Sequence, residues 1–258
     1  MLRIALGSIR IAMGLAAAGL VVWGGWKLGK HLAHMTLDEI EYYINTAKSL
    51  RKKYDEIIDI KIGFEIEFIK DQVNQLNIHL NKVKPELDFI FGSVHVLHSE
   101  KGLWPMDDSR FVEIFEEIGV DVVYTTFYNH LREMIQSKQF DFDIVSHFDL
   151  PKKFNKNPKN KEQFWEEVDK TLELIKKHNL VMEINTSGFR KDVKEQYPST
   201  EIIKKMKELD IPILLGSDAH DPREVGWEFK KMVRILKEIG YDQLACYSKR
   251  KRTYIELQ

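Results

Sequence analysis

Five short stretches of the sequence place metal- or phosphate-binding residue types directly after an apolar run. They are Gly63-Phe64-Glu65, Gly92-Ser93-Val94-His95, Ser146-His147-Phe148-Asp149, Asn185-Thr186-Ser187-Gly188-Phe189-Arg190 and Gly216-Ser217-Asp218-Ala219-His220. Carboxylate and imidazole ligands without a thiolate suit Zn, Mn or Fe. Asp218 and His220 stand two residues apart, so on an extended segment their side chains point the same way. The pattern predicts a divalent-metal site.

Each of these residues taken alone also has an ordinary structural interpretation. A single histidine at a strand end, such as His95, is commonly a hydrogen-bonded structural residue, and Glu65 alone could be a salt-bridge partner. The clustering of five such stretches, in sequence order on successive strands, favours metal binding over packing. The single cysteine, Cys246, lies in none of them and is expected to be a buried apolar residue rather than a nucleophile.

Strands and helices alternate from Met35 to the C-terminus. The apolar periodicity predicts strands over 60–69, 89–97, 142–147, 181–185, 211–217 and 252–257. It predicts helices over 36–53, 71–83, 161–178, 199–209 and 222–239, and a mostly helical interval over 107–138 with a second helical stretch around 120–135. This order indicates an α/β fold of parallel strands covered by helices, and a length of 258 residues favours a β/α barrel. The C-terminal strand ends of such a barrel converge on one face, which would bring the five stretches together.

Composition restricts the partners and the compartment. Lys plus Arg is 39 and Asp plus Glu is 40, so the net charge of −1 favours neither nucleic acid nor an anionic membrane. The basic run Lys249–Arg252 is short and is expected to be a solvated turn. With one cysteine, no internal disulfide can form, and a cytoplasmic, reducing setting is expected. The oligomeric state is left open.

Residues 1–34 form an atypical apolar segment ahead of a domain predicted over 35–258. Between Ile4 and Trp26 the only charged residue is Arg10. The uninterrupted part, Ile11–Trp26, is shorter than the roughly 20 residues that span a bilayer. Three interpretations stay open: a membrane anchor, a buried part of the domain, or a segment foreign to it. His31 and His34 are spaced to share one face of a helix and could bind a metal together.

The motifs GFEIEF, FGSVHVL, DIVSHFDLPKKF, EINTSGFRK, YPS and GSDAH together resemble the PHP superfamily, and most closely its monofunctional histidinol-phosphatase branch. The resemblance runs from about Met35 to the C-terminus. It implies a distorted seven-stranded β/α (TIM-like) barrel with two or three divalent metal ions.

The resemblance also implies roles for individual residues. Glu65 is similar to the carboxylate that bridges two metals, and His95 and His147 are similar to ligands of one of them. Asp218 and His220 resemble ligands of the other positions, and either is a candidate for proton transfer. Arg190 resembles the arginine that binds the substrate phosphate, a role that suits its fork of donors.

The sequence departs from the family at its start. The family begins with a strand carrying His-x-His, and residues 1–34 contain no such motif. The first strands are therefore expected to be replaced or missing. Only the position formed by Glu65, His95 and His147 keeps its full set of family ligands.

The resemblance implies an enzyme of histidine biosynthesis that hydrolyses L-histidinol phosphate, a small-molecule phosphate ester, to L-histidinol and phosphate. Two alternatives stay open. One is a PHP-derived protein of impaired activity that binds a phosphate ligand or a partner, with membrane attachment through residues 1–34. The other is a PHP phosphoesterase with a different substrate.

Overall fold

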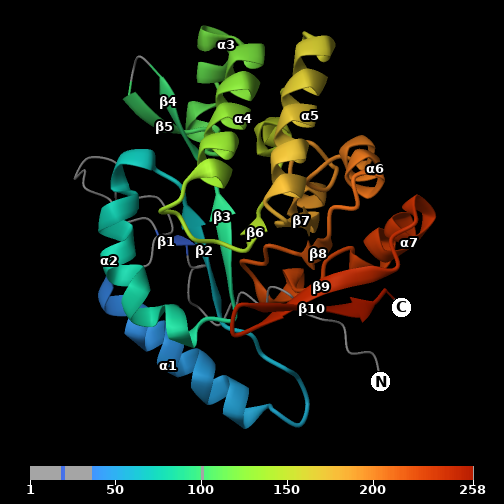
Figure 1. Ribbon diagram of the computed structural model, residues 1–258. Helices are drawn as coiled ribbons and strands as arrows, with labels where there is room; N and C mark the ends of the chain where they lie inside the picture. Colours follow the sequence, from blue (N-terminus) through green and yellow to red (C-terminus); the bar gives the residue numbers. More distant parts are fainter. Residues whose placement is uncertain (1–18, 21–36, 100–101, 258) are drawn as a thin grey trace.

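The structure of the protein is a computed structural model that describes residues 19–20, 37–99 and 102–257. A parallel sheet runs through the centre of the molecule in the strand order β1-β2-β3-β6-β7-β8 (Figure 1). Its strands are β1 (Gly19–Leu20), β2 (Gly63–Glu67), β3 (Phe89–Ser93), β6 (Ile144–Val145), β7 (Val181–Asn185) and β8 (Ile213–Gly216). Two antiparallel hairpins accompany it, β4 (Val96–Ser99) with β5 (Gly102–Pro105) and β9 (Gln243–Ser248) with β10 (Lys251–Glu256).

The described residues form seven α-helices, which lie around this sheet. They are α1 (Leu37–Lys53), α2 (Val73–Val83), α3 (Ile114–Ile118), α4 (Val120–Gln136), α5 (Lys161–Lys177), α6 (Thr200–Glu208) and α7 (Phe229–Ile239). Helix α4 shows why the sequence is helical there: Val123, Phe127, Leu131 and Met134 recur every three or four residues, and all four are buried. Helices α4 and α5 stand side by side above the sheet in Figure 1, while α1 and α2 lie at the other end, beside β2.

The strand alternation sends successive side chains to opposite faces of the sheet. On one face, a large apolar cluster that includes Ile90, Met182 and Leu215 packs against the helices. On the other face, Phe89 and Phe91 of β3 pack with Val181, Leu214 and residues of β9 in a smaller cluster. The apolar positions of this second face are followed, toward the C-terminal strand ends, by polar ones.

Strand register explains how this polar edge arises. Glu65 of β2 pairs with Phe91, and Glu67 pairs with Ser93. On β7, Glu183 pairs with Leu214 of β8. The carboxylates of Glu65, Glu67 and Glu183 therefore stand on the face that carries the smaller apolar cluster, at its C-terminal end.

The expectation of an α/β fold with a parallel sheet is confirmed, and the seven-stranded closed barrel stays a prediction. Several elements differ from the predicted ranges. The α-helical part of the interval predicted over 107–138 begins only at Ile114 and is two helices, α3 and α4, separated at Gly119. The strand predicted over 89–97 is two strands, β3 and β4, which are separated at Val94 and His95. Strand β5 and strand β9 were not predicted. Helix α7 begins at Phe229, because the residues from 217 to 228 form a loop with one short 3-10 turn, Pro222–Glu224.

The apolar segment 1–34, with His31 and His34, lies outside the described residues except for Gly19 and Leu20. These two residues form β1, which pairs in parallel with β2, Gly19 opposite Glu65 and Leu20 opposite Ile66. Among the described residues, no helix combines the length and the apolar character needed to cross a membrane.

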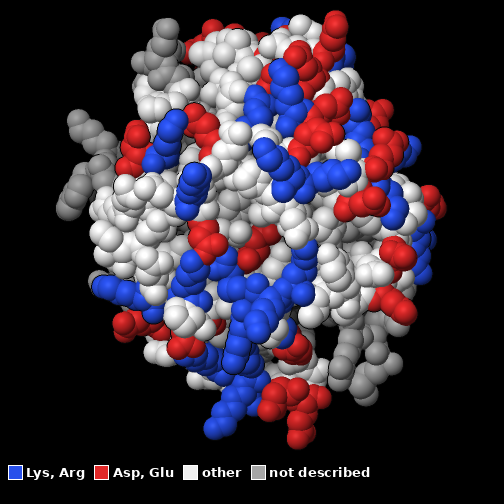
Figure 2. Space-filling model, viewed as in Figure 1, with Lys and Arg blue, Asp and Glu red and all other residues white. Residues whose placement is uncertain are grey.

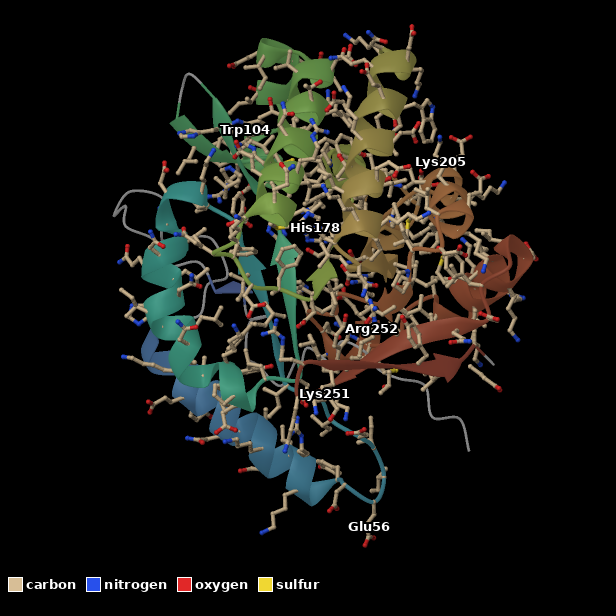
Figure 3. All side chains as sticks on the ribbon, viewed as in Figure 1. Glu56, Trp104, His178, Lys205, Lys251 and Arg252 are labelled. Atoms are coloured by element: carbon tan, nitrogen blue, oxygen red, sulfur yellow. The ribbon has the colours of Figure 1, made fainter. Side chains whose placement is uncertain are left out.

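The basic run Lys249–Arg252 was expected to be a solvated turn, and this is true only in part. Lys249 and Arg250 make the turn of the β9–β10 hairpin, as expected, but the Arg250 side chain is only 17% exposed and pairs with Asp143 and Asp141. Basic side chains form a stripe on the face shown in Figure 2, in the region where Figure 3 labels Lys251 and Arg252 of β10. Arg252 donates hydrogen bonds to the backbone oxygen and the side chain of Asn179.

Candidate metal centre

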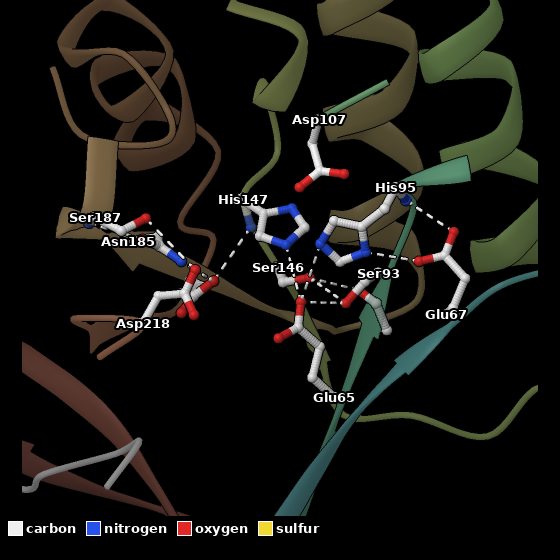
Figure 4. Close-up of polar contacts among 12 residues, drawn as sticks. Glu65, Glu67, Ser93, His95, Asp107, Ser146, His147, Asn185, Ser187 and Asp218 are labelled. Atoms are coloured by element: carbon white, nitrogen blue, oxygen red, sulfur yellow. Dashed lines mark hydrogen bonds and ion pairs between the residues drawn. The ribbon is translucent and has the colours of Figure 1, made fainter. Parts of the chain in front are cut away.

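Glu65, His95 and His147 meet at the C-terminal edge of the sheet (Figure 4). His147 Nε2 lies 2.9 Å from Glu65 Oε1, and His95 Nε2 lies 3.6 Å from the same oxygen. One ligand atom from each of the three residues lies within 4.8 Å of the other two. These are the three residues expected to form one complete metal position.

His95 is oriented by Glu67, the second acidic residue of β2. Glu67 Oε2 lies 2.7 Å from His95 Nδ1, and Oε1 accepts hydrogen bonds from the backbone N–H groups of His95 (2.8 Å) and Val96 (2.9 Å). A carboxylate at Nδ1 favours the tautomer that leaves Nε2 available to a metal. Burial acts to lower the pKa of His95, but the charge and hydrogen bond of Glu67 outweigh it, and the pKa is raised above its ordinary value.

Glu65 is oriented by two serines that precede the histidines in sequence. Ser93 Oγ donates to Glu65 Oε1 at 2.7 Å. Ser146 Oγ lies 2.8 Å from Ser93 Oγ and 3.0 Å from the backbone oxygen of Gly92. Ser93 therefore holds the Glu65 carboxylate directly, and Ser146 supports Ser93.

The backbone at His147 is held by Glu183 of β7. His147 has a positive φ of 20°, and its N–H donates to Glu183 Oε2 at 3.2 Å. The side-chain amide of Asn185 donates to the same oxygen at 3.1 Å. A Cβ atom at Gly216 would stand 2.0 Å from Glu183 Oε1, so only glycine leaves space for this carboxylate.

Asp218, His220 and Arg190 lie on the loops after β7 and β8. In the described part of the chain, no set of three close carboxylate or imidazole atoms includes Asp218 or His220. Asp218 Oδ2 lies 3.5 Å from Ser187 Oγ, and the His220 side chain is 54% exposed, with Nδ1 3.0 Å from the backbone oxygen of Asp218. The structure thus brings together three of the five expected metal ligands.

Arg190 is anchored to the same loop. Its Nη2 donates to the backbone oxygens of Ser217 (2.9 Å) and Asp218 (3.1 Å), and its Nε lies 3.2 Å from Glu224 Oε1. The Nη1 atom is buried and has no hydrogen-bond partner within the described residues. One edge of the guanidinium is therefore oriented by the protein, and the binding of a substrate phosphate by Arg190 stays a prediction.

Asp107, which follows β5, is not among the site residues predicted from the sequence. In Figure 4 its carboxylate lies over the rings of His95 and His147, on the side opposite to Glu65. Lys153 Nζ donates to Asp107 Oδ2 at 3.0 Å and to its backbone oxygen at 2.6 Å. Burial acts to raise the pKa of Asp107, but the charges of His95 and Lys153 outweigh it, and the pKa is lowered.

The donor set fits a divalent ion of the zinc type. Zinc is held by imidazole nitrogens and carboxylate oxygens, and a catalytic site has three protein ligands and one open position. Ligand atoms about 2.0–2.1 Å from a tetrahedral ion stand about 3.4 Å apart. The separations of 2.9 and 3.6 Å between Glu65 Oε1 and the two imidazole nitrogens bracket that value.

A protein-family model described as PHP domain matches residues 33–187. The chain belongs to the PHP domain family. A Deinococcus radiodurans protein named probable histidinol-phosphatase is 30% identical over 206 residues, an alignment that covers 80% of this chain and 75% of that protein. The Bacillus subtilis histidinol-phosphatase is 26% identical over 204 residues, which cover 76% of each chain.

Two solved structures share the architecture of this PHP domain. A Listeria monocytogenes protein superposes with a TM-score of 0.75 at 24% identity, covering 84% of this chain and 86% of that one. The Lactococcus lactis histidinol phosphate phosphatase, complexed with zinc, L-histidinol and phosphate, gives a TM-score of 0.64 at 20% identity, covering 83% and 79%. At these identities the likeness establishes the fold, and the arguments about the site depend on its geometry.

Three residues of this PHP domain site were missed by the sequence analysis, Glu67, Asp107 and Glu183. Glu67 and Glu183 stand in the motifs GFEIEF and EINTSGFRK, and their alternation with apolar residues was an available signal. Asp107 follows a hairpin that no periodicity predicts, and its place over the site comes only from the fold.

Proposed function

We propose that this chain hydrolyses L-histidinol phosphate to L-histidinol and phosphate with a divalent metal ion held by Glu65, His95 and His147. The observation that carries the proposal is the convergence of these three ligands at the C-terminal edge of the sheet. The substrate is inferred from the relatives named histidinol-phosphatase and from the Lactococcus lactis structure with L-histidinol and phosphate. Reaction and substrate place the chain among phosphomonoester hydrolases of histidine biosynthesis.

The ion, when bound, supplies positive charge toward the phosphoryl oxygens and acidifies a water molecule. The chain's own contribution is to hold and orient the groups around it. Glu67 and Ser93 fix His95 and Glu65 through the hydrogen bonds described above. Arg190 is oriented by Ser217, Asp218 and Glu224, so that Nη1 can donate to a phosphate oxygen and neutralise charge in the transition state.

The remaining predictions concern residues outside the three-ligand group. Asp218 and His220 are proposed to serve a further metal position or to transfer the proton to the leaving group. The two lie on one loop, with His220 Nδ1 3.6 Å from Asp218 Oδ1. We propose 35–258 as the catalytic domain, in the cytoplasm, with its sheet a version of the family's seven-stranded barrel. Membrane attachment through residues 1–34 is the alternative.

The test is steady-state phosphate release from L-histidinol phosphate by the full chain with added Zn²⁺ or Mn²⁺. The control is Glu133→Gln, which removes an exposed carboxylate paired with Lys70 and should leave the rate unchanged. Glu65→Gln should lower kcat/KM on the order of 100-fold or more, because it removes a ligand of the ion. Turnover by wild type that Glu65→Gln leaves intact would refute the proposal. No turnover by wild type would favour the phosphate- or partner-binding alternative.

A further inference from the structure

We propose that Asp107 selects substrates that carry an ammonium group beside the phosphate ester, by accepting a hydrogen bond from that ammonium. This inference rests on the proposed function and names the residue that would distinguish L-histidinol phosphate from an uncharged phosphate ester. It concerns specificity, and Asp107 is not one of the ligands that we assign to the metal.

Asp107 lies at the candidate metal site but outside its group of ligands. Its carboxylate lies over the rings of His95 and His147, across the site from Glu65 (Figure 4). It is absent from the group of ligand atoms that lie within 4.8 Å of one another. Asp107 therefore stands beside the candidate metal position without belonging to its ligand group, and this is the side on which we place the organic part of a bound phosphate ester.

The position of Asp107 is fixed by the packing of the residues that precede it. Trp104, labelled in Figure 3, is buried on β5, and its ring packs 5.7 Å from that of Phe115. The N–H of Met106 donates to the backbone oxygen of His95 at 2.9 Å. The backbone before Asp107 is thus joined to His95, and Lys153 holds the Asp107 carboxylate.

The Asp107 carboxylate has room to accept a further hydrogen bond. Lys153 Nζ donates to Oδ2 at 3.0 Å, and no hydrogen bond within the described residues reaches Oδ1. The side chain is 25% exposed, so Oδ1 is accessible to a ligand. A carboxylate has about four lone-pair positions, so one lysine leaves room for a second cation.

The proposed substrate carries a positive charge close to its phosphate. A carboxylate beside a phosphate-binding site repels the phosphate, so it favours binding only if the substrate brings a positive charge to it. L-Histidinol phosphate carries an ammonium on the carbon next to the ester CH₂ group, within a few bonds of the phosphate. A charge-assisted hydrogen bond between that ammonium and Asp107 would convert the repulsion into selectivity.

The experiment compares two esters with the full chain loaded with Zn²⁺ or Mn²⁺. One is L-histidinol phosphate, and the other is 3-(imidazol-4-yl)propyl phosphate, which lacks only the amine. Wild type should prefer the amine by about 10- to 100-fold in kcat/KM, the range for hydrogen bonds that involve a charged group. Asp107→Asn should reduce this preference to within about threefold, with bound metal and thermal unfolding unchanged.

The matched control is Asp108→Asn, at the neighbouring carboxylate. Asp108 pairs with Arg110 and caps the short helix that follows, a position that asparagine also suits. It should keep the wild-type preference.

Three results would overturn the assignment of Asp107. They are equal preference in wild type, an unchanged preference in Asp107→Asn, and an equal loss on both esters together with loss of metal, which would make Asp107 a ligand. No turnover of either ester by wild type would refute the proposed function itself, and this assignment with it.

Discussion

His95 can offer Nε2 to a metal only while Nδ1 carries the proton and the ring faces Glu65. Glu67 meets both requirements with one carboxylate, which contacts Nδ1 and the two backbone N–H groups at the end of β3. Three hydrogen bonds to one buried side chain define its position closely. The orientation of the ligand is therefore set by a residue that does not reach the metal position.

Glu67→Gln tests this role. The amide keeps the shape but loses the charge, and it can no longer favour the proton on Nδ1 as strongly. We expect Zn²⁺ affinity to fall about 10- to 100-fold, measured by competition with a chelator of known affinity. Glu116→Gln, which removes an exposed partner of Lys156, should bind Zn²⁺ as wild type does. Wild-type affinity in Glu67→Gln would show that His95 needs no such support.

At the residue scale, the sequence was most informative about the ligands themselves. Glu65, His95 and His147 come together because Glu65 lies on β2 while His95 and His147 follow β3 and β6, and the C-terminal ends of these neighbouring parallel strands share one edge. Asp218 and His220 also follow a strand, but they do not belong to the group of close ligand atoms found among the described residues, and the backbone of Asp218 has a positive φ of 46°. Their roles stay predictions, because residue type and strand position do not determine loop conformation.

At the scale of elements, the pairing of β7 with β8 positions Glu183, which in turn holds the backbone of the candidate metal site. Gly216 pairs with Asn185 in the strand register, and it leaves the space that Glu183 fills. Glu183 in turn accepts the N–H of His147. A side chain at position 216 would therefore displace Glu183 and disturb the backbone of His147, a candidate metal ligand.

Gly216→Ala should displace the Glu183 carboxylate, since the added Cβ would stand 2.0 Å from its oxygen. We expect a loss of about 1–3 kcal/mol in the free energy of unfolding, from overpacking, together with weaker Zn²⁺ binding. Ile213→Val on the same strand removes one methylene from the core, and should cost about 1 kcal/mol with unchanged Zn²⁺ binding. Urea unfolding and metal titration measure both effects. Equal Zn²⁺ affinity in the two variants would contradict the coupling.

The strands and helices were predictable wherever a long apolar period exists. Helix α5 and strand β7 match the predicted ranges to within one residue, because each has a regular pattern bounded by polar residues. Strand β5 was missed and β4 was merged with β3 in one predicted strand, because strands of four residues are too short to show a period. Strand β9 was missed because it is paired by β10, which follows it in sequence, and not by the central sheet.

At the scale of the whole molecule, Asp88 joins the two ends of the described domain. This buried carboxylate accepts hydrogen bonds from the backbone N–H of Ile62 (2.8 Å) and of Lys249 (2.9 Å), and it pairs with Arg51 of α1. One side chain thus ties the first helix, strand β2 and the C-terminal hairpin together, at a distance in the fold from the strand ends that carry the site.

Asp88→Ala should lower the free energy of unfolding by about 2–4 kcal/mol, because it leaves buried backbone donors without a partner. Asp169→Ala removes an exposed partner of Lys205 on α5, and should change the free energy by no more than about 0.5 kcal/mol. Urea denaturation measures both. Zn²⁺ affinity below the unfolding transition should stay unchanged in Asp88→Ala, and a loss of affinity there would show that this link reaches the site.

The whole-molecule architecture could be predicted as alternating strands and helices around a parallel sheet, and the sheet has that form. The packing of β9 into the smaller apolar cluster could not be predicted, because that cluster joins residues such as Tyr247 and Phe91 that are far apart in sequence. The same holds for Arg250, whose charge is matched by Asp143 and Asp141 from another part of the chain.

The most direct test of the central claim is a metal titration of the chelator-treated full chain, with metal binding and phosphate release from L-histidinol phosphate followed together. We expect the metal-free chain to be inactive and activity to return as Zn²⁺ or Mn²⁺ binds, whereas Glu65→Gln should bind metal weakly and lose on the order of 100-fold or more in kcat/KM. Equal turnover with and without metal, or wild-type metal binding in Glu65→Gln, would contradict the central claim.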